Sequence, residues 1–163
     1  MKPTLTIRPL SNADSARAAT LILSIQQGEF NVPITLADQP DLLDLETAYF
    51  NPGGHFWGAF ADGELVGTIA LLAPSNIGVI RKMFVKPAFR GKQWGVAQQL
   101  FETLIAYARE KKMVALYLGT IHFLHAACRF YEKNGFKKIP QPDLPKAFPL
   151  MPVDDTFYQL PLL

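Results

Sequence analysis

The sequence predicts a mixed α/β fold, in which a central sheet of about seven mostly antiparallel strands is flanked by about four helices. Two apolar runs flank the pair Asp62-Gly63, which is a strong signal of an antiparallel hairpin. The clearest amphipathic helix, at 97–108, follows another strand and therefore implies a crossover to a parallel neighbour. The length of 163 residues, with 49% hydrophobic and 18% charged residues, suits one compact domain over residues 1–163.

The N-terminal part of the chain predicts one strand and two helices. Alternating apolar and polar residues favour a strand over 4–10. Short polar side chains within 11–14 then offer N-caps to an alanine-rich helix that continues to about Gln27. A second, shorter helix is expected to begin near Pro40, because proline is favoured in the first helical turn, and to reach Tyr49.

The rest of the chain alternates between predicted strands and helices. The central strands are expected at His55–Phe60, Leu65–Leu72 and Gly78–Val85. A loop over Lys86–Gln93 leads into the best helix, whose apolar residues recur at helical spacing from Ala97 to Ala108. The last predicted elements are a strand over Val114–Leu118, a helix over Phe123–Lys133, and strands over Phe136–Ile139 and Thr156–Leu160. Five of the thirteen prolines stiffen the loop over 140–152.

Composition and charge exclude several classes of protein. Sixteen basic against fourteen acidic residues leave a net charge of +2, which is too small to indicate a nucleic-acid partner. The single cysteine, Cys128, excludes an internal disulfide and a thiolate-rich metal site, as expected in a reducing compartment. The N-terminus has no apolar core of signal-peptide length, and the longest apolar stretch, 65–74, is too short to span a bilayer. We therefore expect a cytoplasmic protein without a membrane partner.

One segment stands out by its charge. No acidic residue lies between Glu64 and Glu102, and the five basic residues in that span are Arg81, Lys82, Lys86, Arg90 and Lys92. The segment contains a strand, a loop and the start of the best helix, and a helix N-terminus with unpaired N–H groups attracts anions. Gly91 and Gly95 allow backbone to approach a ligand closely. We predict a phosphate site here; the alternative is a solvated basic loop.

This segment fits neither of two common phosphate-binding motifs. Gly91-Lys92-Gln93 lacks the GxxxxGK[ST] spacing of a P-loop. The dinucleotide fingerprint GxGxxG is also missing, because only Gly91 and Gly95 are present and they stand four residues apart.

Two motifs resemble those of GNAT-type N-acetyltransferases. Arg90-Gly-Lys-Gln-Trp-Gly95 is similar to the [Q/R]xxGx[G/A] acetyl-CoA signature of that family, with Gln93 in place of the middle glycine. Ala127-Cys-Arg-Phe-Tyr-Glu-Lys-Asn-Gly-Phe136 resembles the AxxxYEKxGF helix end of the same family. The order and spacing of the two motifs agree with the family, which implies an acetyl-CoA-dependent enzyme.

The resemblance implies a cofactor site between two strands. The sheet would splay between the strand ending at Val85 and the strand ending near Leu118, with acetyl-CoA in the gap. Backbone groups of 83–85 would pair with the pantetheine arm, and N–H groups of 91–96 would hold the pyrophosphate, helped by the charges of Arg90 and Lys92. The expected cofactor-binding residues are Met83, Phe84, Val85, Arg90, Gly91, Lys92, Gln93, Trp94, Gly95 and Val96.

Tyr131 matches the tyrosine that the family places near the sulfur of the departing CoA. Full proton transfer from a phenol with a pKa of about 10 to a thiolate with a thiol-like pKa of about 8.5 is uphill by roughly 2 kcal/mol. Tyr131 is therefore expected to stabilise the thiolate by hydrogen bonding, while solvent completes the transfer. The alternative is an aromatic residue that only packs on Phe136.

The general base is not assigned by the resemblance. Val79 stands where many family members carry a glutamate, and Leu124 stands where an asparagine often contacts pantetheine. The remaining candidates for the base are His122, His125 and Glu46, each of which could equally be a surface residue. Together with His55 the histidines could also suggest a metal, but without thiolates or an HExxH helix we expect none.

The acceptor is also left open. In the family it is selected by the first two helices, their connection and the last hairpin, which are 26–35, 46–50 and 140–155 here. Asp154 and Asp155 could attract a cationic amine or form a solvated pair. The aromatic residues of these regions and the nearby strands could wall the site or belong to the core: Phe30, Phe56, Trp57, Phe148 and Phe157. Because no long charged face is present, a small molecule is favoured.

The resulting expectation is an N-acetyltransferase that moves the acetyl group from acetyl-CoA directly to a primary amine. Cys128 shows no pattern of an activated nucleophile, so no covalent enzyme intermediate is expected. The main alternative is a non-catalytic acyl-CoA sensor, and a more distant one is a protein-interaction domain with a basic loop. The apolar terminal strand at 160–163 leaves a homodimer open.

Overall fold

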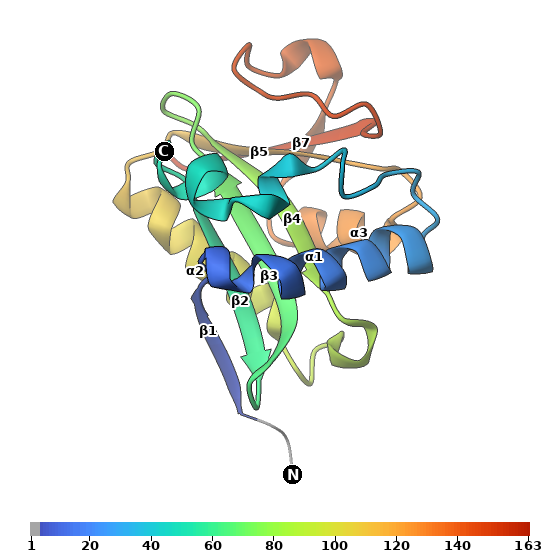
Figure 1. The fold of residues 1–163 in the computed structure, drawn as a ribbon. Helices are drawn as coiled ribbons and strands as arrows, with labels where there is room; N and C mark the ends of the chain where they lie inside the picture. Colours follow the sequence, from blue (N-terminus) through green and yellow to red (C-terminus); the bar gives the residue numbers. More distant parts are fainter. Residues whose placement is uncertain (1–3) are drawn as a thin grey trace.

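The computed structural model describes residues 4–163, so residues 1–3 of the predicted domain lie outside the described part. These residues form one seven-stranded sheet with the order β1-β2-β3-β4-β5-β7-β6 (Figure 1). The strands are β1 (Leu5–Pro9), β2 (His55–Ala61), β3 (Glu64–Leu72), β4 (Gly78–Val85), β5 (Ala115–Thr120), β6 (Lys137–Ile139) and β7 (Thr156–Pro161). Within residues 4–163, only β4 and β5 are parallel, and every other pair is antiparallel. The predicted mixed, mostly antiparallel sheet is confirmed.

The helices agree with the prediction in number and depart from it in shape. They are α1 (Ser15–Leu23), α2 (Val96–Glu110) and α3 (His125–Lys133). A wide turn, η2 (Ser24–Glu29), extends α1. The second predicted helix is two short pieces, η3 (Pro40–Leu43) and η4 (Glu46–Phe50). The break lies at Asp44, whose φ of −151° and ψ of 83° fall outside the helical region.

The C-terminal boundaries also need correction. The third helix begins at His125 rather than Phe123, because Leu124, with a ψ of 71°, is not helical. The last strand, β7, lies between β5 and β6. Its pairing with β6 covers only Phe157–Gln159, so the dimer suggested for the terminal strand stays a prediction.

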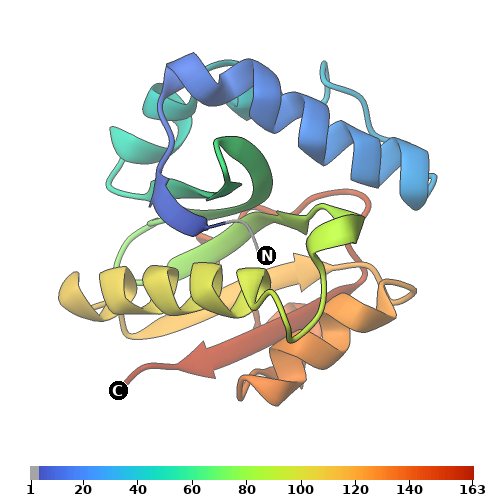
Figure 2. The same ribbon diagram turned by 90° about the horizontal axis from the view of Figure 1, so that it is seen from below.

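The helices cover both faces of the sheet, α1 with η3 and η4 on one face and α2 on the other (Figure 2). The side chains of β2 alternate between the two layers: Phe56 and Phe60 belong to the core under α1, whereas Trp57 and Ala59 pack with α2. Within residues 4–163, no helix is long and apolar enough to cross a membrane.

The start of α1 is fixed by Asp14. Its carboxylate accepts hydrogen bonds from the backbone N–H of Ser11 and from the side chains of Arg8 and Arg17, and it is only 2% exposed. Burial by itself would raise the pKa of Asp14, but these hydrogen bonds lower it to about 2. The network ties β1 to the first helix and thereby sets the direction in which α1 crosses the sheet.

We expect the Asp14→Asn variant to lose about 2 kcal/mol of unfolding free energy at pH 7. The folded pKa lies below the unfolded value of 3.8, so this contribution is present above pH 3.8 and is lost as the pH falls toward 2. Urea unfolding of both proteins between pH 7 and pH 2 measures the effect. The two stability curves should converge at low pH, and curves that stay parallel would contradict this role.

Candidate active site

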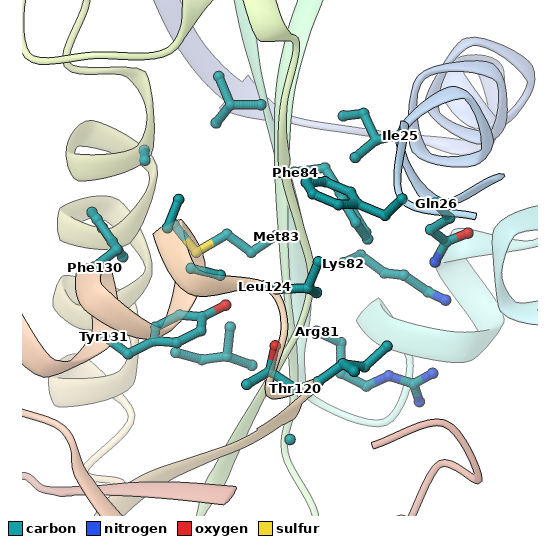
Figure 3. Close-up of a pocket in the computed structure, with 18 of the residues that line it drawn as sticks. Ile25, Gln26, Arg81, Lys82, Met83, Phe84, Thr120, Leu124, Phe130 and Tyr131 are labelled. Atoms are coloured by element: carbon teal, nitrogen blue, oxygen red, sulfur yellow. The ribbon is translucent and has the colours of Figure 1, made fainter. Parts of the chain in front are cut away.

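The sheet opens between β4 and β5. The two strands pair at only two positions, Gly78 with Leu116 and Val79 with Tyr117, and then diverge. A cavity of about 750 Å³ lies in the opening, and residues of η2 and the loop after it, β4, α2, β5, α3 and the β6–β7 loop surround it (Figure 3). The splayed sheet expected from the sequence is therefore present, and Val79 lies at its apex.

The register of β3 and β4 decides which backbone groups of β4 face the opening. The N–H of Lys86 donates to the carbonyl of Val66 at 2.8 Å, so the alternate residue Phe84 also turns its backbone toward β3. The backbone N–H and C=O groups of Met83 and Val85 therefore point toward the cavity. The carbonyl of Val85 already accepts a hydrogen bond from Arg90 Nε at 2.9 Å. Met83 and the N–H of Val85 are thus the main-chain groups available for a ligand strand.

A bulge interrupts β4 at the middle of the cavity. The register with β3 shifts between Thr68 and Ala70, and Lys82 adopts a φ of +53°, which is unusual for a residue with a side chain. The hydroxyl of Thr68 donates to the Lys82 carbonyl at 2.7 Å and holds the bulge. Figure 3 shows the consequence, because the side chains of the adjacent residues Arg81 and Lys82 leave β4 on the same side.

Lys82 is nearly buried, and its charge has protein partners. Its Nζ lies 3.7 Å from Asp41 Oδ2 and donates to the side-chain oxygen of Gln39. Gln39 also exchanges hydrogen bonds with Gln26 of η2. Burial lowers the pKa of Lys82 to about 8, although Asp41 counteracts the shift. The sequence did not predict this network, because it joins segments far apart in the chain.

The loop before α2 is a tight turn that leads directly into the N-terminus of the helix. Gly91 and Gly95 have φ values of +107° and +64°, a region that glycine enters without strain. The N–H groups of Trp94 and Gly95 donate to the Gly91 carbonyl at 3.2 and 3.1 Å, which closes a tight turn. The first turn of α2, from Val96, leaves N–H groups without intrahelical partners.

The two basic residues predicted to contact phosphate differ in their surroundings. The guanidinium of Arg90 forms a two-pronged pair with Glu29, at 2.6 and 2.7 Å, besides its bond to Val85. The Arg90 side chain therefore connects η2 to the end of β4. Lys92 is exposed on the cavity rim and makes no hydrogen bond or ion pair within residues 4–163.

Three of the predicted cofactor residues, Gln93, Trp94 and Val96, are not among the residues that surround the cavity. The Trp94 ring packs on Phe89 at 4.8 Å. The side-chain oxygen of Gln93 lies beside Gly91, 3.1 Å from where a β-carbon would be. A cofactor role for these three residues would therefore have to use their backbone.

The Tyr131 hydroxyl points into the cavity, between Met83 and Thr120 (Figure 3). Its side chain is 7% exposed, and the hydroxyl makes no hydrogen bond within residues 4–163. Burial raises the pKa of Tyr131 well above its usual value, and the charges of Cys128 and Asp154 act in the same direction. The phenol therefore stays protonated and can donate a hydrogen bond to a bound ligand.

Asp154 reaches the cavity from the loop before β7. Its carboxylate lies against Gly119, where a β-carbon would come within 2.6 Å of Oδ2. Within the described residues it has no hydrogen bond and no ion pair. Burial raises the pKa of Asp154 to about 6, although Arg81 and Lys82 act to lower it. A partly buried carboxylate with this pKa is ionised at neutral pH and can accept a proton.

The structure separates Asp154 from its neighbour in sequence. Asp155 is exposed, accepts a hydrogen bond from the backbone N–H of His122 at 2.8 Å, and pairs with the ring of the same residue at 2.5 Å. Neither Asp155 nor His122 borders the cavity. Hence only one of the two adjacent aspartates predicted to attract an amine is placed to do so.

Arg81 brings a positive charge to the same cavity. The only hydrogen-bond contact of its guanidinium within residues 4–163 is with the sulfur of Met151, at 3.4 Å. No carboxylate oxygen of the described residues lies within 4.0 Å of it. Arg81 is thus a cation on the cavity wall without a carboxylate partner.

The other candidate bases are less well placed. Glu46 lies outside the cavity, and His125 is exposed at the rim, on the first residue of α3. His55 stacks on Trp57, with ring centroids 4.5 Å apart. Among residues 4–163, no three His, Cys, Asp or Glu side chains gather in a way that could hold a metal ion.

The expected aromatic wall divides into two groups. Phe30 and Phe148 border the cavity. Phe56, Trp57 and Phe157 are 0%, 4% and 3% exposed and belong to the core. The Leu124 side chain extends into the cavity, so an apolar group stands at the position where the family often has an amide (Figure 3).

A sheet that splays at its one parallel pair, with a glycine-containing loop and a helix N-terminus at the opening, is the GNAT fold. The model of the acetyltransferase (GNAT) family matches residues 20–136. The chain therefore belongs to the acetyltransferase (GNAT) family.

Known proteins similar to this chain agree with that assignment. A GNAT-family acetyltransferase structure from Staphylococcus aureus is 36% identical, with a TM-score of 0.95, and the match covers 98% of this chain and 100% of that one. The N-acetylaspartate synthetase of Danio rerio is 32% identical over 126 residues, which are 74% of this chain. The match spans only 44% of the synthetase. An N-acetyltransferase of Thermoplasma acidophilum, solved in complex with coenzyme A, is 20% identical to this chain and shares its fold. The TM-score is 0.72, and the match covers 97% of this chain and 99% of that one.

Proposed function

We propose that the chain is an acetyl-CoA-dependent N-acetyltransferase that transfers the acetyl group directly to a primary amine of a small molecule. The observation that supports this most is one cavity bordered by three features: the unpaired edge of β4, the N-terminal region of α2 and the hydroxyl of Tyr131. These features supply strand-like pairing for the pantetheine arm, an anion site and a hydrogen-bond donor. A non-catalytic sensor would need the first two but not the third.

The proposed cofactor contacts follow from the backbone. Met83 and the N–H of Val85 would pair with the pantetheine amides, because their backbone faces the opening. The N–H groups of Gly91 and Lys92 and of the first turn of α2 would hold the pyrophosphate, helped by the helix dipole, while the N–H groups of Trp94 and Gly95 close the turn on the Gly91 carbonyl. Lys92 would add a charge. Arg90 would position the loop through its pair with Glu29, rather than contact phosphate directly.

The proposed chemistry is a direct acyl transfer. Asp154 accepts a proton from the ammonium group of the acceptor, and the neutral amine attacks the thioester carbonyl. A C–N bond forms and the C–S bond breaks, while the Tyr131 hydroxyl donates a hydrogen bond to the departing sulfur. The attacking nitrogen, which is positively charged in the tetrahedral intermediate, loses its second proton to solvent as the intermediate collapses, and solvent protonates the thiolate. Cys128 does not border the cavity, which agrees with a mechanism without a covalent enzyme intermediate.

Calorimetric titration with acetyl-CoA tests this proposal, with dephospho-CoA and ADP as controls. We expect one site in the micromolar range, about −7 to −8 kcal/mol. The same protein, mixed with acetyl-CoA and a panel of amines, should release thiol. Absence of acetyl-CoA binding at high ligand concentration would overturn the proposal, and binding without thiol release from any amine would favour the sensor.

A further inference from the structure

The cavity presents two opposite charges that do not contact each other. Arg81, on β4, has no carboxylate oxygen of the described residues within 4.0 Å. Asp154, on the loop before β7, has no hydrogen bond or ion pair within residues 4–163. The two are close enough for Arg81 to lower the pKa of Asp154, yet they form no salt bridge. The guanidinium of Arg81 and the carboxylate of Asp154 can therefore each contact a ligand directly.

The third charged group at this side of the cavity is already satisfied. Lys82 is paired with Asp41 and donates to Gln39, while the Tyr49 hydroxyl donates to the same Asp41 carboxylate. This closed network belongs to the wall formed by η3 and η4. It leaves one cation, Arg81, and one anion, Asp154, as the charged groups that an acceptor would meet.

We propose that the acceptor is a zwitterionic α-amino acid, whose carboxylate binds Arg81 and whose ammonium group binds Asp154. This inference rests on the proposed acetyltransferase function. A partly buried charge without a partner costs free energy, and a ligand that carries both opposite charges satisfies the two at once. A simple amine leaves the guanidinium unpaired. The planar guanidinium also suits a carboxylate, which it can bind through two parallel hydrogen bonds.

The rest of the acceptor side favours an apolar side chain. The apolar residues that border this part of the cavity are Ile25, Phe30, Val32, Ile34, Phe148 and Val153. Lys82, the other cation that β4 contributes to the cavity, is already held by Asp41, so a second carboxylate, as in aspartate, would have to compete with that pair. An amino acid of the size and polarity of leucine complements this wall.

The binding mode also accounts for release of the product. During transfer one ammonium proton passes to Asp154 and a second is lost to solvent, the new C–N bond replaces the C–S bond, and the product is an amide without positive charge. The carboxylate of the product still binds Arg81, but Asp154 has lost its cationic partner. After Asp154 returns its proton to solvent, it again carries a negative charge that favours the next zwitterion over the acetylated product.

A matched series of acceptors tests the inference: L-leucine, L-leucinamide, 3-methylbutylamine and L-aspartate, each assayed for thiol release from acetyl-CoA. We expect kcat/KM for L-leucine to exceed the value for L-leucinamide by roughly 10- to 100-fold, because the amide lacks the charge that Arg81 binds. The Arg81→Gln variant should lose this preference, and Arg81→Lys should keep part of it. Arg109→Gln, an exposed change outside the cavity, serves as the control.

Calorimetry separates the possible failures. Both Arg81 variants and the control should bind acetyl-CoA as the unmodified protein does, which shows that they are folded. Equal turnover of 3-methylbutylamine and L-leucine would overturn the zwitterion assignment and leave the acetyltransferase function intact. A preference for L-aspartate over L-leucine would overturn the apolar side chain. Acetyl-CoA binding without turnover of any member would overturn the inference, and the wider amine panel then decides the proposed enzyme activity.

Discussion

The Asp154→Asn variant is expected to lose roughly 10²- to 10⁴-fold in kcat/KM at pH 8, with the affinity for acetyl-CoA unchanged. Asparagine keeps the shape of the side chain beside Gly119 but can neither carry a negative charge nor accept the ammonium proton. The loss should therefore fall on the chemical step and on acceptor binding. Steady-state kinetics with L-leucine, together with calorimetry for acetyl-CoA, measures the two parts separately.

The pH profile gives an independent test of the same residue. Because the pKa of Asp154 is raised to about 6, the unmodified enzyme should gain activity as the pH rises through 6, where the base loses its proton. The charged groups that face this carboxylate are Arg81 and Lys82 on β4 and Asp155 beside it, and Tyr131 on α3 stays neutral in this range. The rise near pH 6 should be absent from Asp154→Asn.

Asp155→Asn is the matched control, since it makes the same change one residue away, outside the cavity. Asp155 contacts His122, and we expect this variant to stay within about twofold of the unmodified activity. Its loss of negative charge should move the rise in activity to slightly lower pH, because Asp155 helps to raise the pKa of Asp154. Equal losses in the two variants would exclude Asp154 as the base.

Much of the fold could be predicted because its signals are local. The Asp62-Gly63 pair lies in the turn between β2 and β3, and the apolar stripe from Ala97 to Ala108 packs on the sheet as α2. The helical spacing after Pro40 was misleading, because its apolar residues pack on α1 and the sheet from two short turns instead of one helix. Local periodicity does not show where the backbone at Asp44 departs from helical angles.

The candidate site was harder to predict because its decisive features depend on contacts between distant segments. The two aspartates Asp154 and Asp155 are equivalent in sequence, and only the alternation of the chain entering β7 sends them in opposite directions. The partner of Arg90 is Glu29, which lies 61 residues away. The sequence around Lys82 does not predict a bulge, because the register shift arises from the pairing of β4 with β3.

The Tyr131→Phe variant should reduce kcat by roughly 10²- to 10³-fold and leave acetyl-CoA affinity within about twofold. The hydroxyl is the only group removed, and it has no hydrogen-bond partner within residues 4–163, so no protein group becomes unsatisfied. The ring keeps its packing on Phe136 and Tyr158, with centroids 5.8 and 5.9 Å away. The melting temperature should therefore stay nearly constant.

A loss confined to kcat would distinguish stabilisation of the leaving thiolate from a packing role for Tyr131. Tyr107→Phe is the control, because that hydroxyl donates to the Gly53 carbonyl outside the cavity and should affect stability rather than turnover.

Since burial raises the pKa of Tyr131 well above its usual value, the unmodified enzyme should keep its activity up to about pH 9.5. Loss of activity well below pH 9.5 would contradict a buried hydroxyl that stays protonated. An unchanged kcat in Tyr131→Phe would leave the packing role as the explanation, and the thiolate would then have to depart with solvent as its only donor.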